Sequence, residues 1–394
     1  MEDSESSPSR KRLNGSSTKF IPLDLTVEIL CRLPGEALIR FQAVSKLWFS
    51  TIRSKDFADS FLIRSKTRPR FLFTFKHFDS RKRFIFSAPE HGRNDRTSTA
   101  VARHDMTISD LVYYIRSRPV NGFVCCTRGS SIAVCNPTTR QIVKLPDVES
   151  NGRQVYARLG YDPVGDQYKV LCVMMFNRDR AMRGKKGFQL EHYVFTLQSQ
   201  QKEWRKIEIT QSVRYYYDVR EGICINGVIY YIAEGSSRII IRFDVRSEKL
   251  DLIQPPEKPR IRLFYDSSLL NYNGKLGGIE YDGFNEVVLW ILEDAEKQEW
   301  SETRCARPSD LYNVLKGYVN LKGEIRTGEL IIIGSRLKSS IPFSVWYYDF
   351  QRESIRRVDI EGIADDEFRR VYGIGKRTRE ILSFPGFVEN IMYL

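Results

Sequence analysis

The sequence contains few of the residues that build metal centres and catalytic triads. Only 4 of its 394 residues are histidines, at positions 77, 91, 104 and 192. Its 7 cysteines are scattered, and no two have the Cys-x-x-Cys spacing of a zinc site. A disulfide framework would instead show an even set of cysteines at regular spacing. We therefore expect no metal, no cofactor, and reduced thiols buried in a cytoplasmic or nuclear protein.

Long apolar runs are also missing. The longest, such as residues 170–176, have the length of a β-strand and are too short to span a bilayer. Residues 1–19 are rich in serine and charge and lack the apolar segment of a secretory signal. We expect these residues to form a disordered tail. The sequence thus predicts no membrane partner.

Positive charge exceeds negative charge along the chain. The net charge is +13, which favours acidic partners and raises nucleic-acid binding as an alternative. Basic residues are densest at 64–83 and 178–186. Neither cluster is interleaved with exposed aromatic residues, as a surface for single strands would be. We therefore expect the charge to steer acidic partners rather than to bind nucleic acid. Steeply salt-dependent binding of RNA or DNA would support the alternative.

A densely apolar stretch near the N-terminus has helical periodicity. Pro22 suits the first helical position, and Asp24 places a negative charge in the first turn. Apolar residues follow four positions apart at Leu25, Ile29 and Leu33, before Pro34 ends the helix. Further short helices are expected at 36–43, after the capping residue Ser45, and at 56–65. Residues 20–66 hold more apolar side chains than these short helices can bury among themselves.

From residue 67 onward the pattern changes to short strands that repeat. The segments IAVCNPTTRQIVKLP, IIIRFDVRSEKLDLI and VWYYDFQRESIRRV share an apolar strand, a polar turn and a second strand. They align on Asn136, Asp244 and Asp349, and looser copies surround Thr196 and Glu293. Sixty residues before Asn136, Lys76 lies in an aromatic hairpin, RFLFTF to RFIFSAP, that gives a sixth unit. About 50 residues per unit is the size of a propeller blade.

Tight glycine turns precede several of these units, as in VNGFVCC, INGVIYY and YNGKLGG. The first unit lacks inner strands, whereas the C-terminal sequence REILSFPGFVENIMYL offers strand residues with no partner. We expect the C-terminal strand to complete the first blade and close the ring. The predicted fold is a small all-α module of three to four short helices at 20–66, followed by an all-β domain at 67–394. That domain is expected to be a kelch-like β-propeller of about six blades, with a large β-sandwich as the alternative.

Catalytic motifs are not evident in the sequence. It has no Gly-x-Ser-x-Gly and no His-Glu-x-x-His segment. GIGKRT at 373–378 is similar to the end of a phosphate-binding loop, but Arg377 stands where Ser or Thr would bind magnesium. An enzymatic propeller, the remaining alternative, would need metal ligands or paired carboxylates at its centre. We therefore expect a protein without catalytic residues.

The helical stretch resembles an F-box in the order and spacing of its residues. The residues that carry the resemblance are Ile21-Pro22-x-Asp24-Leu25, Glu28-Ile29-Leu30, Arg32-Leu33-Pro34, Leu38-x-Arg40-Phe41, and Val44-Ser45-Lys46-x-Trp48 with Ile52. The remainder is similar to the plant F-box-associated interaction domain, in the phrases NPTTRQIVKLP, LGYDPVGDQYKVLCV and GFVENIMYL.

This resemblance implies the substrate receptor of an SCF-type ubiquitin ligase. The F-box would bind a Skp-family adaptor and, through it, the cullin and RING-box subunits. The β domain would hold a protein target whose identity and binding residues the sequence does not give. No catalytic residue is needed, since the transfer of ubiquitin takes place on other subunits. The adaptor-binding residues implied are Pro22, Leu25, Ile29, Leu30, Leu33, Pro34, Leu38, Phe41, Val44 and Trp48.

Overall fold

A computed structural model gives the conformation of most of the chain. It describes residues 21–394 except 78–79, 94, 96, 110–113, 150–153, 177–188, 208–215, 236–237, 257–267, 282–285, 307–318, 325–327, 338–341, 350–351, 364 and 373–378. The expected tail at 1–19, the basic segment 178–186 and the GIGKRT segment lie outside the described residues.

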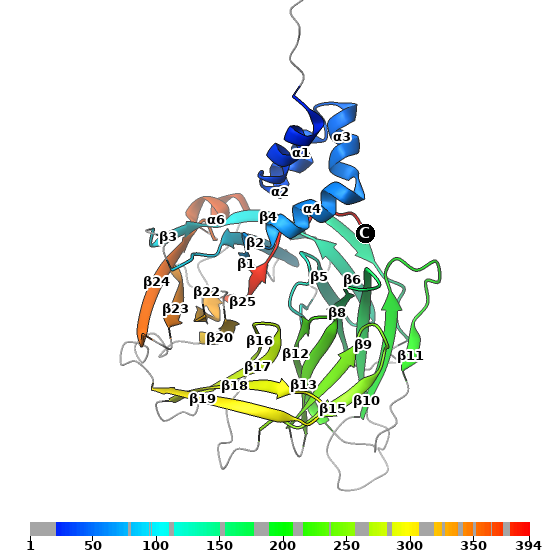
Figure 1. Ribbon diagram of the computed structural model, residues 1–394, viewed down its shortest axis with the longest axis vertical. Coiled ribbons are helices and arrows are strands. Elements are labelled where there is room, and N and C mark those ends of the chain that lie inside the picture. The colour runs from blue at the N-terminus through cyan, green and yellow to red at the C-terminus, as the bar shows by residue number, and fades with distance from the viewer. Residues whose placement is uncertain are drawn as a thin grey trace, which may run out of the picture.

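Six β-sheets are arranged as blades around a common centre, and a helical module projects from the edge of this ring (Figure 1). The six-bladed β-propeller is thus confirmed. The first blade has the strand order β22-β25-β1-β2-β4. Its strands are β22 (Arg336–Leu337), β25 (Arg379–Phe387), β1 (Arg70–His77), β2 (Lys82–Pro89) and β4 (Arg103–Ile108). The second blade has three strands, β5 (Val124–Arg128), β6 (Ser131–Asn136) and β7 (Gln141–Lys144).

The third and fourth blades are four-stranded antiparallel sheets. The third comprises β8 (Gln154–Asp162), β9 (Gln167–Phe176), β10 (Gln189–Thr196) and β11 (Arg205–Ile207). The fourth comprises β12 (Tyr216–Ile225), β13 (Val228–Gly235), β14 (Arg238–Asp244) and β15 (Leu250–Ile253). The turn between β12 and β13 is the predicted Asn-Gly turn, with φ of 48° at Asn226 and 82° at Gly227.

The fifth and sixth blades continue the ring. The fifth comprises β16 (Ser268–Tyr272), β17 (Lys275–Tyr281), β18 (Glu286–Asp294) and β19 (Glu299–Ala306). The sixth comprises β20 (Val319–Glu324), β21 (Glu329–Gly334), β23 (Phe343–Asp349), β24 (Ser354–Glu361) and the distant β3 (Thr99–Val101). The repeat anchors Asn136, Thr196, Asp244 and Asp349 are each the last residue of a strand. The period read from the sequence is therefore the period of the blades.

The ring is closed at two places. β25 pairs antiparallel with β1, for example Phe75 with Ile381, so the C-terminal strand completes the first blade as predicted. β3 pairs in parallel with β24, for example Thr99 with Asp359, and so joins the first blade to the outer edge of the sixth. Sequence analysis did not predict this second closure, because a three-residue strand carries no periodicity.

Apolar side chains fill the space between neighbouring blades. Between the first and sixth blades, for instance, the rings of Phe73 and Phe343 lie edge to face, with centroids 5.4 Å apart. The middle of the ring is crossed by the segment that precedes β5. Ser117 forms a parallel bridge with Gly222 of β12, and Arg118 donates through Nη2 to the carbonyl of Leu269, 2.6 Å away. These contacts join the second blade directly to the fourth and fifth.

The helical module consists of α1 (Leu23–Cys31), α2 (Gly35–Phe41), α3 (Lys46–Arg53) and α4 (Lys55–Ser65), and a separate helix, α6 (Asp366–Tyr372), follows β24. Ser45 caps α3 as expected, since its side chain accepts a hydrogen bond from Trp48 N. Pro22 has an extended backbone and is the N-cap of α1, so the expected first helical position is shifted by one residue. No helix among the described residues has the length and apolar character needed to span a bilayer.

The C-terminal residues 388–394 lie between the helical module and the propeller. Glu389 accepts a hydrogen bond from Gly35 N of α2 and forms an ion pair with Arg103 of β4, at 2.7 Å. Asn390 donates to the carbonyl of Asn121, 2.7 Å away, and Ile391 is buried in the core of the helical module. The end of the chain therefore fixes the module on the ring.

Candidate functional site

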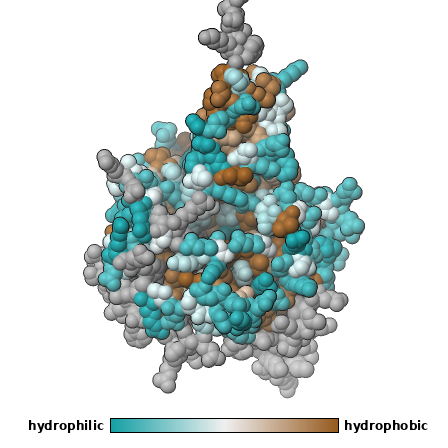
Figure 2. All heavy atoms as spheres, viewed as in Figure 1, coloured by the Kyte–Doolittle hydropathy of each residue, from teal (hydrophilic) through white to brown (hydrophobic). Residues whose placement is uncertain are grey.

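The helical module exposes an unusual amount of apolar surface. Most of the exposed large hydrophobic residues of the described chain belong to it, and Figure 2 shows brown residues gathered on its outer part. Leu25 of α1 is 56% exposed and Phe49 of α3 is 47% exposed. We call these residues the apolar helical face: Ile21, Leu23, Leu25, Ile29, Val44, Leu47 and Phe49. Large exposed apolar patches on a soluble domain usually mark binding sites.

The residues implied by the F-box resemblance fall into three groups. Pro22, Leu25, Ile29, Pro34 and Val44 are exposed and available to a partner. Leu33, Phe41 and Trp48 are partly buried against the module core, where the rings of Phe41 and Trp48 lie edge to face with centroids 5.4 Å apart.

Leu30 and Leu38 belong to the third group, because they are 1% and 0% exposed within this chain. They pack with Phe57 and Phe61 of α4 and with Ile391 from the C-terminus. This position makes them supports of the apolar helical face rather than parts of it. Their burial depends on a residue more than 350 positions away, which helical periodicity alone could not reveal.

Sequence reasoning also missed exposed apolar residues. Leu23, Leu47 and Phe49 are about half exposed or more, although none was among the implied adaptor-binding residues. A signal was available for α3, since Leu47 and Phe49 flank the partly buried Trp48 on a helix with one buried residue, Ile52. Phe49 contacts the guanidinium of Arg53, 5.3 Å from its ring centroid, yet it remains 47% exposed.

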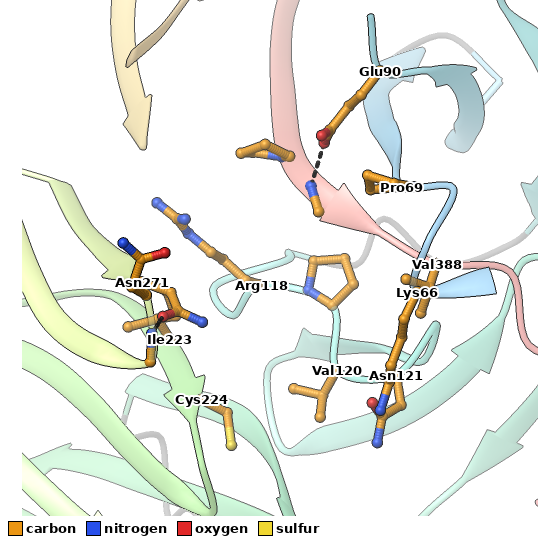
Figure 3. A pocket seen from close by; sticks show the side chains of 15 residues that line it. Lys66, Pro69, Glu90, Arg118, Val120, Asn121, Ile223, Cys224, Asn271 and Val388 are labelled. Atoms are coloured by element: carbon orange, nitrogen blue, oxygen red, sulfur yellow. Dashed lines mark hydrogen bonds between the residues drawn. The ribbon is translucent and has the colours of Figure 1, made fainter. Parts of the chain in front are cut away.

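A second candidate site is a pocket of about 440 Å³ in the propeller, next to the linker that follows the helical module (Figure 3). Its walls come from the linker after α4, the segment before β5, strand β12, the turn after β16, and the end of β25. Arg118 points into the space between these walls, while Glu90 holds the backbone at Gly386 through a hydrogen bond of 2.5 Å. The principal polar lining residues are Lys66, Glu90, Arg118, Asn121, Asn271 and Asn273.

Two titratable groups at this pocket are fixed by their surroundings. Burial raises the pKa of the Cys224 thiol to about 11, so the thiol stays protonated and unreactive near neutral pH. Arg118 is held by Glu221, 3.4 Å from its Nε, and by the carbonyl of Leu269. No group of three or more His, Cys, Asp or Glu side chains among the described residues could hold a metal ion. The pocket offers polar and charged contacts for binding.

Comparisons with known proteins agree with this arrangement. Residues 20–59 match the F-box domain family, and residues 70–388 match the F-box associated beta propeller domain family. An F-box protein of Arabidopsis thaliana is 40% identical over 95% of this chain and 98% of its own length. A second F-box protein of Arabidopsis thaliana is 35% identical over 87% of this chain and 85% of its own length. An F-box/kelch-repeat protein of the same plant is 31% identical over 91% and 92% of the two chains. With its helical module and six-bladed ring, the chain belongs to the plant F-box proteins that carry an F-box-associated β-propeller domain.

Proposed function

We propose that the protein is the substrate-recognition subunit of an SCF-type ubiquitin ligase. Its apolar helical face would bind a Skp-family adaptor and, through that adaptor, the cullin and RING-box subunits. The propeller would hold a target protein for ubiquitination. The observation that carries the proposal is the apolar helical face itself, whose seven side chains are 47% to 61% exposed.

The chemistry of this face fits helix-in-groove recognition. Leu25 and Ile29 are four residues apart on α1, so their side chains lie on one side of the helix. Val44 and Leu47 add apolar area from α3 and the turn before it. Burying such side chains in a partner's apolar groove contributes about 25 cal/mol for each Å² removed from water.

The propeller and the helical module are joined firmly enough to act as one receptor. Lys55 of α4 forms an ion pair with Asp166 in the turn between β8 and β9, at 2.8 Å. Arg53 of α3 lies over the ring of Tyr393, 3.7 Å from its centroid. Together with Glu389, these contacts would hold a bound target at a fixed position relative to the adaptor.

The proposal assigns no catalytic role to the chain. It supplies two binding surfaces, and the transfer of ubiquitin to a lysine of the target would occur on the other subunits. The enzymatic alternative would require a reactive group at the pocket, where the Cys224 thiol is held protonated by burial.

Co-purification with a Skp-family adaptor tests the proposal. The double variant Leu25→Asp/Leu47→Asp places two charges on the apolar helical face, and we expect it to abolish co-purification. Val371→Asp is the matched control, because Val371 is 65% exposed on α6, which is not part of the helical module. The control should bind as the unmodified chain does. Full binding by the double variant would refute adaptor docking through this face.

A further inference from the structure

Two positive charges lie opposite each other in the first blade. Lys76 of β1 pairs directly with Arg83 of β2, and like charges at facing positions destabilise a sheet. Arg83 is almost fully buried and donates to Thr74 Oγ1, 3.0 Å away. Two like charges that face each other in a well-formed hairpin are most simply explained by a functional role of this position.

Tyrosine rings and a third cation surround this pair. Lys76 Nζ lies 3.3 Å from the ring centroid of Tyr114, which is 53% exposed. The guanidinium of Arg116 lies 4.8 Å from the ring of Tyr156 and 5.9 Å from that of Tyr114. These rings stabilise the cations in part but cannot neutralise them. We call Lys76, Tyr114, Arg116 and Tyr156 the cation–tyrosine surface.

Lys76 and Arg116 differ from several paired cations of the propeller. Lys169 and Arg205 share Glu248, and Arg356 binds Glu329, all at 2.7 to 2.8 Å. Among the described residues, by contrast, neither Lys76 nor Arg116 has a carboxylate within ion-pair distance. Burial, followed by the charge of Arg83, lowers the pKa of Lys76 to about 8, and Glu380 opposes this shift only from a distance. The surface therefore carries two positive charges that have no ion-pair partner in the described part of the chain.

The cation–tyrosine surface lies on the face of the ring away from the helical module. β25 ends at Phe387 and leads into the C-terminal residues that contact the module, so its antiparallel partner β1 ends at the other face. The end of β8 nearest the module leads to Asp166, which binds Lys55, so Tyr156 near its start is also remote. A ligand could thus occupy this surface while the apolar helical face is engaged.

We propose that the cation–tyrosine surface binds an acidic segment of the target protein, rich in aspartate or glutamate. The inference rests on the proposed function, since it assigns the class of target that the receptor would recognise. Lys76 lies over Tyr114, whereas Arg116 lies nearer to Tyr156 than to Tyr114, so separate carboxylates spaced along a peptide match the two cations better than one phosphate group would. An extended groove with a ladder of stacked aromatic rings, which single-stranded nucleic acid needs, is not formed by these four residues.

Fluorescence anisotropy with the full chain and a labelled octaglutamate peptide tests this proposal. We expect Lys76→Gln/Arg116→Gln to weaken peptide binding at least tenfold, and Tyr114→Ala to weaken it by a smaller factor. Lys249→Gln is the matched control, because Lys249 is exposed in the turn between β14 and β15 at the opposite face. This control should bind the peptide as the unmodified chain does.

The proposal would be overturned if the unmodified chain did not bind octaglutamate, or if the double variant bound it as tightly as the unmodified chain does. It would also be overturned if the unmodified chain bound a (dT)20 oligonucleotide or a phosphoserine peptide more tightly than octaglutamate and the double variant lost that binding. Thermal unfolding checks that the variants are folded, and the single variant Lys76→Gln serves if the double variant is not. Adaptor co-purification with the same variants should be unchanged. A variant that loses peptide binding but keeps adaptor binding would therefore test the acidic-peptide site independently of adaptor docking.

Discussion

At the scale of single residues, the propeller contains a buried polar cluster that sets its response to acid. His192 of β10 is hydrogen-bonded to the hydroxyl of Tyr231, and the guanidinium of Arg158 lies 4.0 Å from the Tyr231 ring centroid. Burial, together with the nearby charge of Arg158, lowers the pKa of His192 to about 3. His192 is therefore neutral in the folded protein at every pH near neutrality.

This cluster predicts a loss of stability in acid. The unfolded chain protonates His192 near its ordinary pKa of about 6.5, whereas the folded chain does so only near 3. The free energy of unfolding therefore falls by about 1.4 kcal/mol for each pH unit below 6.5. Replacement His192→Gln removes this contribution, so on going from pH 7 to pH 4.5 the variant should gain a few kcal/mol, on the order of 2 to 3, relative to the unmodified chain.

Urea unfolding at several pH values measures this difference. Tyr231→Phe is the control, because it removes the hydrogen-bond partner but leaves the imidazole buried, and it should keep the acid response. A pH-independent difference between His192→Gln and the unmodified chain would show that His192 does not carry the effect.

At the scale of elements, the strands and their turns were more predictable than the contacts made by the chain's end. The hairpin β1–β2 and the anchors at Asn136 and Asp244 followed from alternation and turn residues, which are local signals. The closure by β25 followed from counting strands. The role of residues 388–394 could not be predicted from the sequence, because Glu389 and Ile391 act through partners far away in the sequence.

The turn before β5 shows how this distant packing constrains a local element. Gly122 has a φ of +85°, and a Cβ there would lie 2.7 Å from the Cβ of Asn390 and from the carbonyl oxygen of Val388. Gly129 also has a positive φ, +55°, but a Cβ added there would have no heavy atom within 4 Å. A side chain at Gly129 would therefore meet backbone strain alone, whereas a side chain at Gly122 would also be crowded against the C-terminal residues.

Alanine substitution at these two glycines tests that difference. Gly129→Ala should cost about 1 kcal/mol of unfolding free energy, from the backbone conformation alone. Gly122→Ala should cost about 3 kcal/mol, because overpacking adds to the same strain. Chemical denaturation of both variants measures the two losses. Equal losses would mean that Asn390 and Val388 move aside freely.

At the scale of the whole molecule, the account depends on the C-terminal residues joining two binding surfaces. Ile391 fills the core of the helical module, while Asn136 donates to the carbonyl of Asn390, 2.9 Å away, from the second blade. The adaptor-binding residues could be named from the F-box resemblance, but their division into exposed and buried sets could not. That division depends on α4 and on Ile391, which lie outside the motif.

Truncation of the C-terminus tests whether these residues hold the helical module on the ring. Deletion of residues 389–394 should release the helical module from the ring, so that limited proteolysis cleaves near residues 66–69 much faster. Truncation after Tyr393 is the control, since it keeps Glu389, Asn390, Ile391 and Tyr393 and should leave the cleavage rate nearly unchanged. Equal cleavage of the two truncated chains would show that α4 and the Lys55–Asp166 ion pair suffice to hold the module.

The central claim, adaptor binding through the apolar helical face, is tested most directly by calorimetric titration of a purified Skp-family adaptor into the full chain. We predict one adaptor per chain and a negative heat-capacity change, which is the mark of buried apolar surface. Phe49→Asp should weaken binding at least tenfold, because it places a charge on that face. Absence of binding by the unmodified chain, or an unchanged affinity in Phe49→Asp, would contradict the claim.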